Sequence, residues 1–144
     1  MTPPVAGPIV IRVGTIRAKY EPAEGILHLS HPEHTTLADP KAVAGFFREV
    51  ARLIRRCPQR PYLLVDYANL DIAVDMTREY ANQVRAYRGT VKGVYRYNLS
   101  SDTAGVLTKV AVLLANKSDA NIYGDEASAR AGIRHARTPD RVHP

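Results

Sequence analysis

The run Tyr62-Leu63-Leu64-Val65, bounded by Pro61 and Asp66, decides the fold class of this 144-residue chain. Four consecutive apolar residues between a proline and an acidic residue are typical of a strand that is buried on both faces. Strands of this kind occur mainly in parallel sheets that helices cover on either side. The run therefore predicts an α/β domain with helical segments before and after it.

Helical patterns flank this strand on both sides. Asp39-Pro40 is typical of an N-cap followed by proline at the first helical position, and Pro58 ends the helix after Arg56. A second helix is predicted from Asp75 to Arg88, before Gly89. The apolar residues of the first helix recur at helical spacing and are Val43, Phe46, Phe47, Val50, Leu53 and Ile54.

Strand patterns open the chain and follow the second helix. The segment Ile9–Tyr20 alternates loosely, and Ile26–Leu29 resumes a strand after turn residues, which together predict an antiparallel hairpin. Val91–Leu99 predicts a further strand.

The remaining elements complete the alternation. Ser101 or Asp102 is suited to cap a third helix, although Lys109–Leu114 alone also fits a strand. Asn121–Tyr123 predicts a short strand, and Asp125 caps a final helix through Ala136. The order β-β-α-β-α-β-α-β-α predicts a small, mixed, mostly parallel sheet with about four helices. We expect one domain over 9–137, with flexible tails at 1–8 and 138–144.

Composition suggests a soluble, cytoplasmic protein. No apolar run is long enough to span a bilayer, and Met1–Pro8 lacks the pattern of a secretory signal. Cys57 is the single cysteine, so no intrachain disulfide can form. The basic run before Cys57 favours a lowered thiol pKa, whereas a structural role for the residue needs no such shift.

The chain is basic, with a formal net charge of +6. Arg48, Arg52, Arg55 and Arg56 fall on one helical face, which is typical of the solvated side of an amphipathic helix. No interleaved aromatic residues or groove-reading motif accompany them, so we expect no nucleic-acid partner.

One stretch resembles the STAS family of sulfate-transporter and anti-sigma-factor-antagonist domains. In that family a buried strand ends in Asp, and a second Asp followed by small hydroxyl residues opens a helix. Asp66 and Asp75 match the two aspartates, and Thr77 falls at the phosphorylatable hydroxyl. Met76 and Arg78 stand where the family carries a small hydroxyl residue and a glycine. The stretch reads Leu63-Leu64-Val65-Asp66-Tyr67-Ala68-Asn69-Leu70-Asp71-Ile72-Ala73-Val74-Asp75-Met76-Thr77-Arg78.

The segment Asn121–Ala127 is similar to the last strand, acidic cap and Ala-rich helix of the bacterial SEC14-like STAS relatives. The resemblance implies a non-enzymatic regulatory or protein-interaction module that binds another protein or a second copy of itself. It also implies that Thr77 is the modified residue. The loop expected to contact a partner contains Asp66, Asn69, Asp71, Asp75 and Arg78.

The same residues have plain structural interpretations. Asp75 and Thr77 are suited to cap a helix, and a capping hydroxyl on an exposed loop is also open to phosphorylation. Asp66 either binds a ligand beyond the carboxyl ends of the strands or accepts hydrogen bonds from loop N–H groups.

His28, His31 and His34 carry the donor atoms that zinc prefers. If Ile26–Leu29 is a strand, however, His28 and His31 point to opposite faces, which favours a histidine-bearing surface turn over a metal site. We expect no cofactor.

Four tyrosines come from the second helix and the strand after it: Tyr80, Tyr87, Tyr95 and Tyr97. They are typical of a core margin, and alternatively they line a pocket for a small apolar ligand or lipid. The sequence contains no phosphate-binding glycine loop, nucleophile elbow or paired-cysteine motif, and thus no recognisable catalytic constellation. Ser100-Ser101-Asp102 is better explained as a helix cap than as a nucleophile.

Overall fold

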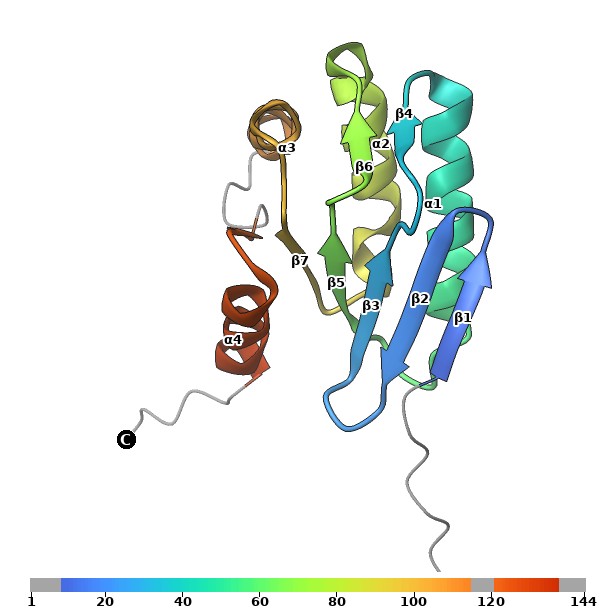
Figure 1. Cartoon of the computed structure of the whole chain (residues 1–144), viewed down its shortest axis with the longest axis vertical. Coiled ribbons are helices and arrows are strands. Elements are labelled where there is room, and N and C mark those ends of the chain that lie inside the picture. Colours follow the sequence, from blue (N-terminus) through green and yellow to red (C-terminus); the bar gives the residue numbers. More distant parts are fainter. Residues whose placement is uncertain (1–8, 115–120, 138–144) are drawn as a thin grey trace, which may run out of the picture.

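A computed structural model describes residues 9–114 and 121–137 and contains a six-stranded mixed sheet (Figure 1). The strand order is β1-β2-β3-β5-β7-β8, with antiparallel pairing from β1 to β3 and parallel pairing beyond. This confirms the predicted α/β class and mostly parallel sheet. The predicted tails lie outside the described residues. The six strands are β1 (Ile9–Val13), β2 (Ile16–Glu21), β3 (Ile26–Ser30), β5 (Tyr62–Asp66), β7 (Gly93–Tyr97) and β8 (Ile122–Tyr123).

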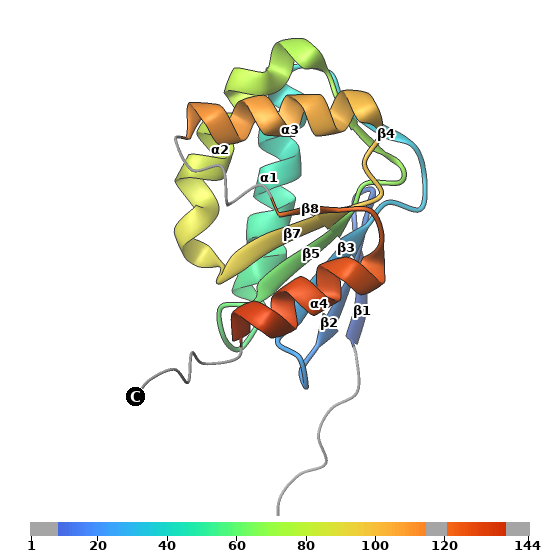
Figure 2. The same cartoon turned by 90° about the vertical axis from the view of Figure 1, so that its left-hand side faces the viewer.

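Helices cover both faces of the sheet. Helices α1 and α2 lie on one face and α4 lies on the other, while α3 packs beside α2 near the carboxyl ends of the strands (Figure 2). Among the described residues, no helix is long and apolar enough to cross a membrane. The described residues form four α-helices, which are α1 (Pro40–Arg55), α2 (Thr77–Tyr87), α3 (Ser101–Leu113) and α4 (Glu126–Arg137).

Side-chain caps set the starts of three helices. Asp39 accepts a hydrogen bond from the Ala42 N–H at 2.8 Å, with Pro40 at the first helical position, as predicted. Asp125 caps α4 in the same way, through the Ser128 N–H at 2.7 Å. The cap of α3 is Ser100 rather than Ser101 or Asp102. The strand alternative for Lys109–Leu114 is wrong, because α3 continues to Leu113.

The chain opens with three antiparallel strands instead of one hairpin. The segment Ile9–Tyr20 is divided by a two-residue turn, Gly14-Thr15, in which Gly14 has φ +58°. A positive φ at the first turn position is typical of a type II′ hairpin and favours glycine. Two further strands, β4 (Thr35–Leu37) and β6 (Leu70–Ile72), form a small parallel sheet beyond the carboxyl ends of β3 and β5 (Figure 1). The sequence did not predict β4 and β6, because three residues are too few to show the alternation of apolar and polar side chains that marks a strand.

Helix α2 starts later than predicted. A 3-10 turn, η1 (Val74–Met76), precedes it, and Met76 occupies the N-cap position with no side-chain hydrogen bond to the helix. The prediction that Asp75 or Thr77 caps this helix is therefore wrong, and the Thr77 hydroxyl donates to the Val74 carbonyl instead. Asp75 belongs to the 3-10 turn and lies one residue before the N-cap position of α2, which Met76 occupies.

Two apolar cores lie on the two faces of the sheet. The larger one fills the space beneath α1, α2 and α3, and the smaller one lies beneath α4. Leu63 and Val65 of β5 point into the larger core, whereas Leu64 points into the smaller one. The strand is thus buried on both faces, as its sequence predicts. The buried members of the smaller core are Ile26, Leu64, Tyr95, Tyr97, Ala129 and Ile133.

Candidate functional site

The loop between β5 and α2 starts with a structural aspartate. One carboxylate oxygen of Asp66 accepts hydrogen bonds from the Ala68 N–H at 2.9 Å and from the Asn98 side chain at 3.2 Å. Asn98 has φ +59°, a left-handed conformation that asparagine tolerates. Asp66 therefore accepts from loop N–H groups, in agreement with its structural interpretation.

The next two polar residues of the loop connect it to the β3–β4 segment. The Asn69 side chain donates to the His31 carbonyl at 2.7 Å, and the Asn69 carbonyl accepts from the Thr35 N–H at 2.7 Å. Asp71 lies 3.3 Å from the ring of His34 and accepts from the Thr103 hydroxyl at 3.4 Å. These contacts hold β6 in place between β4 and α3.

The exposed part of the loop is the corner at the start of α2, which we call the η1–α2 corner and define as Val74 to Arg78. Thr77 is the first residue of α2 and half-buried, and its hydroxyl donates to the Val74 carbonyl at 2.7 Å. The Val74 side chain is 60% exposed, and Asp75 and Arg78 are also exposed. The N-cap residue of α2, Met76, makes no side-chain hydrogen bond to the helix, and the Thr77 N–H donates to the Val74 carbonyl of the preceding 3-10 turn.

An open groove lies beside this corner. It has a volume of about 420 Å³ and runs between η1 and the start of α3. Its walls combine small apolar and hydroxyl side chains with two carboxylates. The lining residues are Thr36, Asp71, Ile72, Ala73, Val74, Ser100, Asp102 and Thr103.

The four predicted pocket tyrosines do not come together. Tyr80 and Tyr87 line a cavity of about 50 Å³ beneath α1 and α2, together with Phe46 and Phe47 of α1 and other, mainly apolar, side chains. Tyr95 and Tyr97 pack beneath α4 instead. Because alternate residues of β7 point to opposite faces, these two tyrosines cannot reach the cavity.

The cavity also contains an arginine that the sequence analysis did not single out. Arg96 is 5% exposed and lies among the hydroxyls of Tyr67 and Tyr80, which are 2.9 Å apart. Burial holds the pKa of Tyr80 well above its usual value. The sequence does contain a signal for this position. Arg96 lies between Tyr95 and Tyr97 in β7, and alternate residues of a strand point to opposite faces of the sheet, so Arg96 points away from the face that the two tyrosines occupy.

The three histidines do not converge. His28 points toward α4, where its Nε2 lies 2.6 Å from the Tyr97 hydroxyl, and burial lowers its pKa. His31 is buried on the other face and stacks on Phe46, and burial lowers its pKa as well. His34 is exposed. In the described part of the chain, no three histidine, cysteine or acidic side chains could hold a metal ion.

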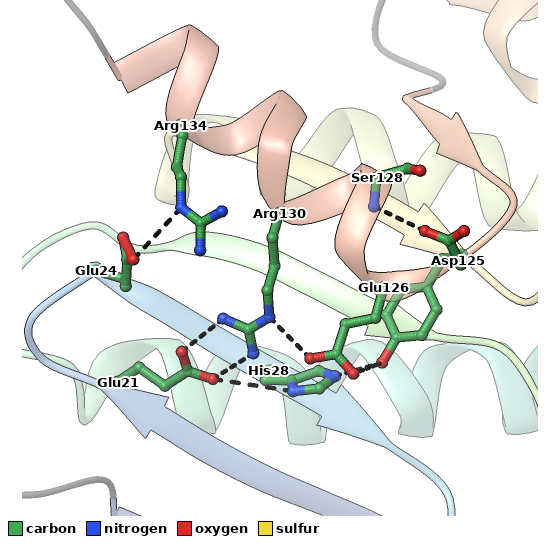
Figure 3. A network of polar contacts seen from close by, with 9 residues as sticks. Glu21, Glu24, His28, Asp125, Glu126, Ser128, Arg130 and Arg134 are labelled. Atoms are coloured by element: carbon green, nitrogen blue, oxygen red, sulfur yellow. Dashed lines mark hydrogen bonds and ion pairs between the residues drawn. The ribbon is translucent and has the colours of Figure 1, made fainter.

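His28 belongs to a polar network beneath α4 (Figure 3), which its contact with the Tyr97 hydroxyl extends. Arg130 makes two hydrogen bonds of 2.7 Å to Glu21 and one of 2.8 Å to Glu126. The Tyr97 hydroxyl donates to Glu126 at 3.4 Å. The hydrogen bonds from Arg130 lower the pKa of Glu21. This network joins α4 to β2, β3 and β7, so its polar groups already have partners.

Cys57 is half-buried, whereas the basic face of α1 is exposed to solvent. The Cys57 thiol is half-buried 3.6 Å from the Leu53 carbonyl, and burial raises its pKa. The predicted lowering by the preceding basic run is wrong, because the basic side chains point to solvent while the thiol lies against the core. The four arginines of the predicted solvated face are all exposed: Arg48, Arg52, Arg55 and Arg56.

Comparison with known proteins adds no assignment: neither the protein-family models nor the curated proteins contain a match to this chain. The fold and the site define its class as an α/β domain with an uncapped helix start beside an open groove.

Proposed function

We propose that this chain is a cytoplasmic, STAS-like regulatory module that binds a protein partner, or a second copy of itself, through the η1–α2 corner. The observation that carries the proposal is the position of Thr77. Its hydroxyl lies at the first residue of an uncapped helix, next to the 60% exposed Val74 and the adjoining groove. Val74 and the mixed groove beside it together offer a partner both apolar and polar groups, the combination found in protein–protein interfaces.

A phosphate on Thr77 would change this surface in a defined way. The phosphoryl oxygens would lie near the positive N-terminal end of α2, which favours a negative group. The Arg78 side chain is close enough in sequence to pair with it, whereas Asp75 would repel it. The modification would therefore reorganise the corner without a change in the core.

Native mass spectrometry of the protein from its own cells tests this proposal. We expect a stoichiometric protein partner, a homodimer, or a phosphorylated fraction that maps to Thr77. A photo-crosslinking residue at Val74 should then capture the partner, whereas the same residue at the exposed Lys41 of α1 should not. Capture at Lys41 alone, or an unmodified monomer under all conditions, would contradict the proposal.

The aromatic cavity favours a second candidate function, the binding of a small ligand. Tyr80, Tyr87 and two phenylalanines line it, and the buried Arg96 supplies a cation. A volume of about 50 Å³ admits a group of only a few atoms, far less than a lipid chain requires. A small molecule retained in the same mass spectrum, with a raised melting temperature on its addition, would support this candidate over the first.

A further inference from the structure

The sheet has an open edge at β1. In the described part of the chain, β1 pairs only with β2 and is the outermost strand (Figure 1). It contains no proline, one of the residues that protect such edges, and Arg12 is its one charged side chain. Because the type II′ turn places a hydrogen-bonded pair at Val13 and Ile16, pairing alternates from there. The backbone N–H and C=O groups of Val10 and Arg12 therefore point outward, away from β2.

The α4-side face of this edge carries adjacent positive charges. Arg12 lies directly opposite Arg17 in the β1–β2 ladder, and both side chains are exposed. Lys19 follows Arg17 on the same face. Like charges directly opposite each other destabilise an antiparallel pair. Neither guanidinium forms an ion pair with a carboxylate of the described residues, so no such pair offsets the repulsion between Arg12 and Arg17.

The other face of the same edge is apolar. Ile9 and Ile11 point to the α1 side, where they line a groove of about 310 Å³ between β1, β2 and the end of α1. Tyr20 and Leu53 form part of its wall, and Arg56 is the one charged side chain among the described residues that line it. The cations and the groove thus flank β1 on opposite faces of the sheet.

This arrangement restricts the kind of partner. A membrane surface can contact only one face of the sheet at a time. A nucleic acid would use the cationic face, but Val10, Arg12, Arg17 and Lys19 include no aromatic platform for bases. An extended peptide in the plane of the sheet sends alternate side chains to both faces and bonds to the open backbone.

We propose that the outer edge of β1 binds an extended acidic segment of another protein as a seventh strand. Its acidic side chains lie beside Arg12, where they offset the Arg12–Arg17 repulsion, and its apolar side chains enter the groove beside Ile9 and Ile11. The chain's net charge of +6 favours encounter with such a segment. This site lies on a different edge from the η1–α2 corner, so either proposal can fail alone.

Synthetic peptides test the proposal directly on the full chain. The probe is a short peptide of alternating glutamate and valine, and the first control has the same composition in two blocks, which cannot place acids and valines on opposite faces. We expect the alternating peptide to bind and the block peptide to bind about tenfold more weakly. Hydrogen exchange should slow at the amides of Val10 and Arg12 when the alternating peptide is present.

A charge reversal separates recognition from stability. The Arg12→Glu/Arg17→Glu variant keeps a like-charged pair, so its fold should be retained. Its affinity for the glutamate–valine peptide should fall by about tenfold or more, and it should bind the corresponding lysine–valine peptide, which the wild type does not bind. The control Lys41→Glu/Arg48→Glu changes the net charge equally on exposed positions of α1 and should leave binding unchanged.

A backbone variant tests strand addition itself. Val10→Pro removes an outward N–H that β2 does not use and should abolish binding of the alternating peptide. Equal binding of the alternating and block peptides, or unchanged binding by the reversal variant, would overturn the proposal. So would binding of anionic vesicles or single-stranded RNA through Arg12 and Arg17 with no binding of the alternating peptide.

Discussion

Arg130 of α4 and Glu21 of β2, which are 109 positions apart in the chain, form a two-pronged ion pair with both N–H···O distances at 2.7 Å. Their side chains are 17% and 12% exposed. A pair that water reaches so little holds α4 against the sheet more firmly than a surface pair would.

Replacing this arginine should loosen α4. We expect Arg130→Met to lower the free energy of unfolding by about 2 kcal/mol, because the Glu21 carboxylate stays partly buried without its partner. Urea denaturation measures the change. The control Arg134→Met affects a more exposed residue, 3.6 Å from Glu24, and should cost about 0.5 kcal/mol. Equal losses for the two variants would contradict the assigned role of Arg130.

The hydroxyl pair of Tyr67 and Tyr80 supports Arg96 inside the larger core. Tyr80→Phe removes one hydroxyl and leaves two buried polar groups with fewer partners, so we expect a loss of about 1–2 kcal/mol in unfolding free energy. Tyr87→Phe is the control, since its hydroxyl has no hydrogen bond to the described residues while its ring stacks on Phe47. A smaller loss of unfolding free energy for Tyr80→Phe than for Tyr87→Phe would contradict this role of the Tyr80 hydroxyl.

Stability should depend on pH through His31. Neither ring nitrogen has a hydrogen-bond partner within the described residues, and burial lowers the ring's pKa below its ordinary value of 6.5. As pH falls through about 6.5, the imidazole of His31 becomes protonated in the unfolded chain but stays neutral in the folded protein. The free energy of unfolding therefore decreases. His28, whose pKa is also lowered, acts in the same direction.

His31→Leu should therefore reduce the loss of stability between about pH 7.5 and about pH 5.5, measured by urea denaturation. It should leave stability at the higher pH equal or raised by about 1 kcal/mol, because two unpartnered buried nitrogens disappear. His34→Leu changes an exposed ring and serves as the control. An unchanged pH dependence in His31→Leu would exclude this ring as the cause.

The Arg12–Arg17 pair predicts an unusual gain. Replacing Arg17 with threonine removes a like-charge contact in a strand that favours β-branched residues, and should stabilise the free protein by about 0.5 kcal/mol. This gain in stability should be smaller in high salt, because salt screens the Arg12–Arg17 repulsion in the wild-type protein. Thermal denaturation at low and high salt provides the measurement, and a loss of stability at low salt would contradict the prediction.

The Cys57 thiol should react slowly. Burial raises its pKa and half covers the sulfur, so both the thiolate fraction and its access to reagents fall. We expect iodoacetamide to modify the folded protein at least about tenfold more slowly than the protein in urea at the same pH. Equal rates would show that the thiol is accessible.

Much of the fold follows from local patterns that the sequence contains. The apolar spacing of α1, its Asp39-Pro40 start and the run Tyr62–Val65 act within a few residues, and the structure confirms them. The predicted start of α2 at Asp75 is wrong, because a 3-10 turn there fits the approach of η1 to α3, and no local signal distinguishes it from the helix.

The sequence by itself determined the α/β class, the helices and the candidate loop, because caps, turns and periodicity depend on neighbouring residues. Only the tertiary structure decided that Arg130 meets Glu21, that Arg96 enters the core, and that the four tyrosines divide between two faces. It also placed Arg12 opposite Arg17, since the turn at Gly14 sets that register. These relationships arise from strand pairing and packing between distant segments, which hydropathy and composition do not encode.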